Sequence, residues 1–63
     1  MDEKVKKFVE YYRIQEIGER QRIRDEFLER SGLRYSSWYP RLRKKKFSAL
    51  EMAALSDICG RGF

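Results

Sequence analysis

Apolar residues recur along this chain at the spacing of an α-helix, and no segment alternates between apolar and polar residues as a strand would. The clearest stripe consists of Val5, Phe8, Val9 and Tyr12, which lie three or four positions apart. This spacing places the four side chains on one helix face. A chain of 63 residues has room for one small domain. The sequence therefore predicts a single all-α domain, a compact bundle of short helices.

We expect four helices followed by a short tail at residues 60–63. Their predicted ranges are 2–13, 19–31, 36–45 and 48–59. Gly32 and Gly60 mark two of the ends, because glycine readily adopts the left-handed conformation that follows the last helical residue. Ile23, Phe27 and Leu28 are the expected buried residues of the second helix.

The last helix has the most explicit start signal in the chain. Ser48 and Glu51 have the spacing of a capping box, in which each side chain bonds the backbone amide of the other residue. Phe47 and Met52 flank this box at the positions of a hydrophobic staple. The buried face of the helix is expected to contain Leu50, Ala54, Leu55 and Ile58.

The third helix contains the only proline, Pro40, which bears on where that helix begins. If it began at Tyr35, Pro40 would lie in its interior and cost about 3 kcal/mol. If Ser37 is instead the N-cap, Pro40 falls in the first turn, where its missing amide is harmless. We favour this later start, or a short 3₁₀ lead-in over residues 35–37. Trp38 and Leu42 are expected to face inward.

The positive charge is concentrated in one central segment, residues 30–46, which has seven basic residues and no acidic one. Acidic residues outnumber basic ones by one on each side of it, so the segment accounts for the net charge of +5. Such a concentration is typical of a protein that binds a polyanion, because neutralised phosphates release counterions. Its cations are Arg30, Arg34, Arg41, Arg43, Lys44, Lys45 and Lys46.

Several function classes are disfavoured by composition. Histidine is absent and Cys59 is the only cysteine, so no intrachain disulfide and no ordinary Cys/His zinc site can form. Without histidine or a metal-ligand set, the carboxylates read as helix-surface charges, and we expect neither an enzyme nor a cofactor. No apolar run is long enough for a signal peptide or membrane span, which favours a cytoplasmic protein.

The residues 31–34 form a tight, glycine-containing connection between two helical patterns, which is the signature of a helix-turn-helix. The stretch 27–42 resembles the helix-turn-helix of small phage and bacterial DNA-binding proteins, and within these the Cro/repressor-like group. The resemblance covers residues ~19–58, with Phe47–Ile58 similar to the helix that buttresses the motif. Residues 36–42 are also similar to the recognition helix of the tetracycline-repressor family. The resemblance implies a bacterial or phage-encoded transcriptional regulator that binds double-stranded DNA.

By position, the resemblance also implies the DNA-binding residues. Arg41 is expected on an outward face, where an arginine can pair with guanine, while Arg43 through Lys46 would follow the phosphate backbone. Useful specificity from so small a module is expected to need a homodimer or a partner protein. The full predicted set is Arg34, Tyr35, Ser36, Ser37, Tyr39, Arg41, Arg43, Lys44, Lys45 and Lys46.

Other interpretations of the same residues stay open. The basic segment could bind an acidic protein, and an arrangement with Arg41 and Arg43 directed away from the face of Ser36 would favour that alternative. RNA binding is less favoured, because the sequence shows no clear aromatic platform for stacking bases. The serines could act only as a helix cap, and the run from Arg43 to Lys46 could be a solvated loop.

Overall fold

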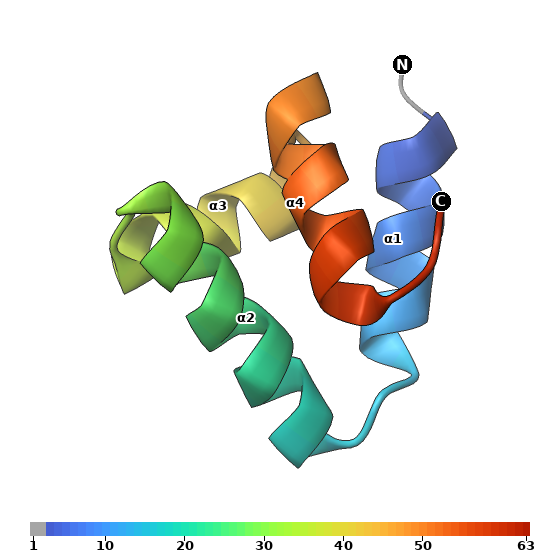
Figure 1. The fold of residues 1–63 in the computed structure, drawn as a ribbon, viewed down its shortest axis with the longest axis horizontal. Helices are drawn as coiled ribbons and strands as arrows, with labels where there is room; N and C mark the ends of the chain where they lie inside the picture. The colour runs from blue at the N-terminus through green and yellow to red at the C-terminus, as the bar shows by residue number, and fades with distance from the viewer. Residues whose placement is uncertain (1–2) are drawn as a thin grey trace.

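The computed structural model describes residues 3–63, and within them it is entirely helical, as predicted. The four helices surround one core, and the domain measures 24 × 22 × 20 Å (Figure 1). None of these helices is long and apolar enough to cross a membrane. Their bounds are α1, Glu3–Arg13; α2, Ile17–Ser31; α3, Tyr35–Lys44; and α4, Ala49–Cys59.

The core is built around aromatic rings from all parts of the chain. Trp38 of α3 is completely buried, and its ring centroid lies 5.3 Å from that of Phe27 and 5.7 Å from that of Phe47. Phe8 of α1 packs edge-on against Phe47, with centroids 5.7 Å apart. Large rings bury much apolar area per residue, which suits a domain this small.

The predicted apolar stripe of α1 is confirmed, since Val5, Phe8, Val9 and Tyr12 are all buried. Position 2, which we assigned to this helix, lies outside the described residues. The C-terminal tail returns along α1 (Figure 1). There the ring of Phe63 lies 5.4 Å from Phe8 and 5.4 Å from Tyr11. The tail therefore closes one side of the core.

Helix α2 starts at Ile17, two residues earlier than predicted, because the Arg20 amide donates to the Glu16 carbonyl at 2.9 Å and completes a turn there. Gly18 thus lies in the first turn of α2. The other end agrees with the prediction. Gly32 is left-handed, with φ 72°, and its amide donates to the Leu28 carbonyl at 2.8 Å. Three residues, 32–34, then lead to α3.

Helix α3 corrects our prediction about Pro40. The helix begins at Tyr35 with Arg34 at the N-cap position, so Ser37 lies inside the helix and is not its N-cap. Pro40 is the sixth of ten residues and lies in the interior. No side chain caps its start. The early start is compensated by burial of Trp38 and by Arg41, whose guanidinium donates to the Ser37 carbonyl at 3.1 Å beside the weakened turn.

Helix α4 has the predicted capping box. The Ser48 amide donates to Glu51 Oε1 at 2.8 Å, and the Glu51 amide donates to Ser48 Oγ at 3.1 Å. The prediction for Leu50 was wrong, since its side chain is 85% exposed. Leu55 and Ile58 are buried as predicted, Ala54 is partly buried against the core, and Met52 completes the buried face. Leu50 lies two positions before Met52, so its side chain points away from the side of the helix on which Met52 lies.

Candidate nucleic-acid interface

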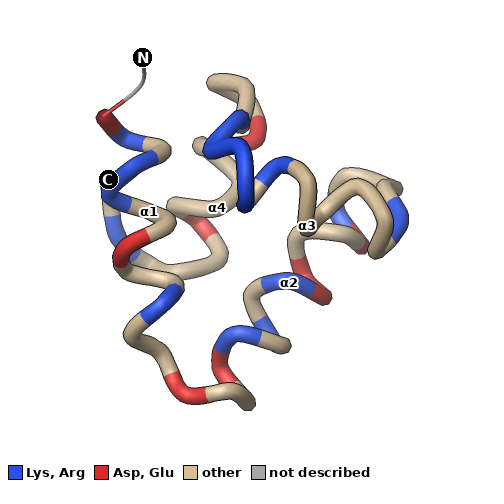
Figure 2. The backbone as a smooth tube through the Cα atoms, turned by 180° about the vertical axis from the view of Figure 1, so that it is seen from behind, with Lys and Arg blue, Asp and Glu red and all other residues tan. Residues whose placement is uncertain are grey.

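The end of α3 and its connection to α4 carry most of the basic segment. Arg43, Lys44, Lys45 and Lys46 are all exposed. Figure 2 shows this stretch as a nearly continuous blue section of backbone between the two helices. Four consecutive exposed cations raise the local positive potential and attract polyanions.

Lys45 gives this connection its shape. It has φ 54°, the only positive φ among the described residues other than glycine. Its amide donates to the Leu42 carbonyl at 3.3 Å, and the amide of Lys46 donates to the Arg41 carbonyl at 2.9 Å. These two bonds form a Schellman ending, for which glycine is the usual residue. The chain thus places a lysine where a left-handed conformation costs about 1 kcal/mol.

Ion pairing divides the basic segment into two groups. Arg30 bonds Asp57 at 2.6 Å, and Arg41 bonds Glu51 at 3.1 Å. The other five cations of the segment make no ion pair within residues 3–63, so their charge is available to a partner. They are Arg34, Arg43, Lys44, Lys45 and Lys46.

Arg41 is not placed as predicted. Its side chain is half-buried and lies between α3 and α4, with Nε donating to Glu51 Oε2 and a terminal nitrogen donating to Ser37. We expected it on an outward face. The pattern of positions did not reveal Glu51 as its partner, because the two residues belong to different helices. Arg41 therefore acts first as a bridge inside the domain.

The two tyrosines of α3 lie one turn apart and lean towards α2. Tyr35 is 56% exposed and Tyr39 48% exposed. The Tyr35 hydroxyl donates to Asp25 at 3.3 Å, while the Arg24 guanidinium lies 4.7 Å from the centre of the Tyr35 ring. Arg24 also donates to the Tyr39 hydroxyl at 3.1 Å. Both rings are thus half exposed and held in place, an aromatic surface that we did not anticipate.

Arg24 and Asp25 are the residues that sequence reasoning missed at this surface. Arg24 is largely covered and bonds Asp25 at 3.0 Å. Its hydrogen bonds to Tyr39 and Asp25 raise its pKa above the ordinary value despite partial burial. No local spacing signals this cluster, because its tyrosines come from another helix.

The serines show which side of α3 faces solvent. Ser36 is exposed and Ser37 is half-buried, and neither side chain caps the helix. Arg43 lies seven positions after Ser36, about two helical turns, and therefore shares its side. Arg41 does not. The exposed side of α3 thus combines Ser36, Tyr39 and Arg43.

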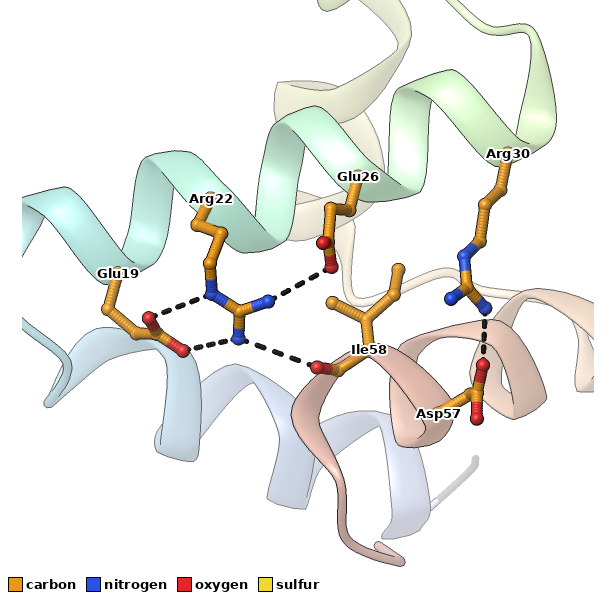
Figure 3. Close-up of polar contacts among 6 residues, drawn as sticks. All are labelled: Glu19, Arg22, Glu26, Arg30, Asp57 and Ile58. Carbon is orange, nitrogen blue, oxygen red and sulfur yellow. Dashed lines mark hydrogen bonds and ion pairs between the residues drawn. The ribbon is translucent and has the colours of Figure 1, made fainter.

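A polar network holds α2 against α4 (Figure 3). Arg22 bonds Glu19 at 2.6 Å and Glu26 at 3.0 Å, and it also donates to the Ile58 carbonyl at 3.4 Å. The hydrogen bond from Arg22 lowers the pKa of Glu19 below its ordinary value. Glu19 and Glu26 are thus engaged in ion pairs on the surface of α2. Across the described part of the chain, no three acidic or cysteine side chains form a group that could hold a metal ion.

Comparison with known proteins adds no relative. No protein-family model matches this chain, and neither the curated proteins nor the solved structures contain a significant match.

Proposed function

We propose that this chain binds double-stranded DNA through a helix-turn-helix formed by α2, the connection 32–34 and α3. In this proposal the exposed side of α3 enters the major groove, and the end of α3 lies along the phosphates. Such a protein would serve as a small transcriptional regulator of the phage or bacterial type, acting in the cytoplasm.

One observation carries the proposal. Among the residues that the structure describes, 3–63, five cations of the basic segment make no ion pair, while Arg30 and Arg41 are neutralised by Asp57 and Glu51. Free cations adjoin an exposed helix side with hydroxyl, phenol and guanidinium groups, from Ser36, Tyr39 and Arg43. Contacts from cations to phosphates position a protein on DNA, and hydroxyl, phenol and guanidinium groups on a helix can contact base edges.

Two features also support the mechanics of docking. The connection between α2 and α3 is only three residues long, and Gly32 ends α2 in the left-handed conformation. Arg24 fastens both tyrosines of α3 to α2, which limits motion between the helices. A rigid pair loses less conformational entropy when it binds.

An acidic protein partner is the alternative. The side shared by Ser36 and Arg43 favours DNA, whereas the position of Arg41 away from that side agrees with the alternative. The half-exposed tyrosines raise a further possibility, because aromatic rings beside cations suit single-stranded nucleic acids. Each of these three functions requires a different partner, so a competition experiment between candidate partners distinguishes them.

The test uses a fluorescent duplex of mixed sequence and follows its anisotropy as protein is added. Unlabelled duplex, unlabelled single strand and poly-glutamate then compete at equal total negative charge. The proposal expects duplex to displace the probe at the lowest concentration. Better displacement by the single strand would support stacking instead, and better displacement by poly-glutamate would support an acidic protein partner.

A further inference from the structure

An open hollow of about 390 Å³ lies where the end of α1, the first turns of α2 and α3 meet. Most of its polar lining comes from Arg20, Gln21 and Arg24 of α2 and from Tyr39 of α3. No carboxylate lines it among the residues 3–63. Both arginines lie outside the basic segment 30–46, so the hollow is a second place on the surface where positive charge collects.

Arg20 is the cation of this hollow that has no partner. Within residues 3–63 its side chain makes no ion pair and no hydrogen bond. Its Nε is buried without an acceptor, whereas its two terminal nitrogens remain accessible. A guanidinium that loses part of its hydration without gaining an acceptor is destabilising, and a bound anion would compensate it. The accessible end of Arg20 is therefore suited to an anion in the hollow.

Arg24 and Tyr39 order the other side of the hollow. Arg24 donates to the Tyr39 hydroxyl at 3.1 Å and to Asp25 at 3.0 Å. Because the Tyr39 oxygen accepts this bond, its own hydrogen is left for an acceptor in the hollow. Asp25 offsets part of the charge of Arg24, so Arg20 is the main cation here. Side chains that are already fixed lose less entropy when a ligand binds.

Arg13 also borders the hollow, but it is expected to contribute less. It is exposed and lies in the last turn of α1, where the negative end of the helix dipole offsets part of its charge. A solvated side chain also loses more rotamer freedom on binding than the partly buried Arg20 does.

We propose that Arg20 holds a phosphate group of the DNA backbone in this hollow. This inference rests on the proposed function. Tyr39 lines the hollow and also belongs to the exposed side of α3, so a phosphate held here would lie beside the groove that α3 enters. The guanidinium group suits phosphate oxygens in charge and in geometry. Two separate phosphate contacts, one here and one at residues 43–46, would fix the orientation of α3 on the duplex.

The first measurement is the salt dependence of the affinity for a mixed-sequence duplex, for the original chain, Arg20→Met and Lys7→Met. Methionine keeps the apolar part of the side chain and removes the charge. Arg20→Met should weaken binding about tenfold at low salt, the range of one charge-assisted hydrogen bond, and reduce the slope by about 0.9. Lys7 is exposed on α1 and does not line the hollow, so Lys7→Met should change the slope much less. The fluorescence of Trp38, the single tryptophan, confirms that each variant is folded.

NMR then observes the side chain directly, through the Nε–H signal of Arg20, which Arg20→Met assigns by its disappearance. Because this Nε is buried, its hydrogen should exchange slowly with water and give a resolved signal. We expect duplex to shift the signal. Inorganic phosphate, compared with chloride at equal ionic strength, should shift it much less. A larger shift with inorganic phosphate than with duplex, at equal phosphate concentration, would overturn the assignment to the DNA backbone and indicate a site for free phosphate.

The outcomes also separate this inference from the proposed function. Equal slopes for Arg20→Met and Lys7→Met would overturn the role of Arg20 and leave DNA binding in place. An Arg20 signal that bound duplex leaves unshifted would do the same. Failure of the folded original chain to bind duplex at low salt would overturn the proposed function and this inference with it.

Discussion

Arg41 and Glu51 join α3 to the start of α4 through a hydrogen bond of 3.1 Å between Nε and Oε2. The other oxygen of the same carboxylate accepts the amide of Ser48 at 2.8 Å. One side chain thus closes the capping box and anchors the preceding helix. Lys45 and Lys46 lie between these anchor points, so their position depends on both. Glu51 therefore shapes the basic connection.

Replacing Glu51 tests this double role. Glu51→Ala removes the capping bond and the partner of Arg41 together, and we expect the free energy of unfolding to fall by about 1–2 kcal/mol. Glu51→Gln keeps an oxygen that can accept from Ser48, so its loss should be smaller. Urea unfolding followed by Trp38 fluorescence measures both. Equal losses in the two variants would show that the capping bond contributes nothing.

Lys45→Gly should make the domain more stable. Its φ of 54° suits glycine, so we expect a gain of about 0.5–1 kcal/mol in the free energy of unfolding. Lys44→Gly is the matched control, because it removes the same charge from the last helical residue and should destabilise the domain. Thermal unfolding by circular dichroism compares the two variants. A loss of stability in Lys45→Gly would contradict this account of the Schellman ending.

Leu50 and Leu55 should respond very differently to truncation. Leu50 is 85% exposed and Leu55 is completely buried. Leu50→Ala is expected to change the free energy of unfolding by less than about 0.5 kcal/mol, whereas Leu55→Ala should cost about 2–4 kcal/mol through the cavity that it leaves. Urea unfolding measures the difference. Similar costs at both positions would mean that α4 packs with another side towards the core.

The ion pair of Glu19 and Arg22 predicts a direction of pH dependence. The hydrogen bond from Arg22 holds the pKa of Glu19 below its ordinary value of 4.5. A lowered pKa in the folded state means that the stabilisation is complete above about 4.5 and disappears as the pH falls through the folded-state value. In Arg22→Met the pKa of Glu19 should rise towards 4.5, as an NMR titration of side-chain carboxyls would show. Arg24→Met is the control, and it should leave Glu19 unchanged.

The sequence predicted the features that depend on local spacing. The stripe of α1 and the capping box of α4 involve residues within eight positions of each other, so periodicity and capping chemistry are sufficient to find them. Gly32 and Gly60 likewise ended their helices, because a left-handed conformation is a local requirement.

Most of the errors came from contacts between helices. Pro40 was expected near a helix start because its local cost is high, yet α3 begins at Tyr35, and the packing of Trp38 against Phe27 of α2 stabilises the longer helix. Within α3, Arg41 also donates to the Ser37 carbonyl. Leu50 was expected to be buried because α4 is apolar on most sides, and only the packing of α2 and α4 decides which side is covered. The link between Arg24 and the tyrosines depends on the same kind of contact.

The most direct test of DNA binding is the salt dependence of the affinity for a mixed-sequence duplex. It should be measured for the original chain, for Arg43→Ala/Lys46→Ala, and for Lys7→Ala/Arg13→Ala, which removes equal charge from α1. If four to six phosphates are contacted, log K should fall against log[salt] with a slope of roughly −4 to −5. The first variant should reduce this slope by about 2, and the second should reduce it much less. Equal slopes for the two variants, or no binding by the folded original chain at low salt, would contradict the account.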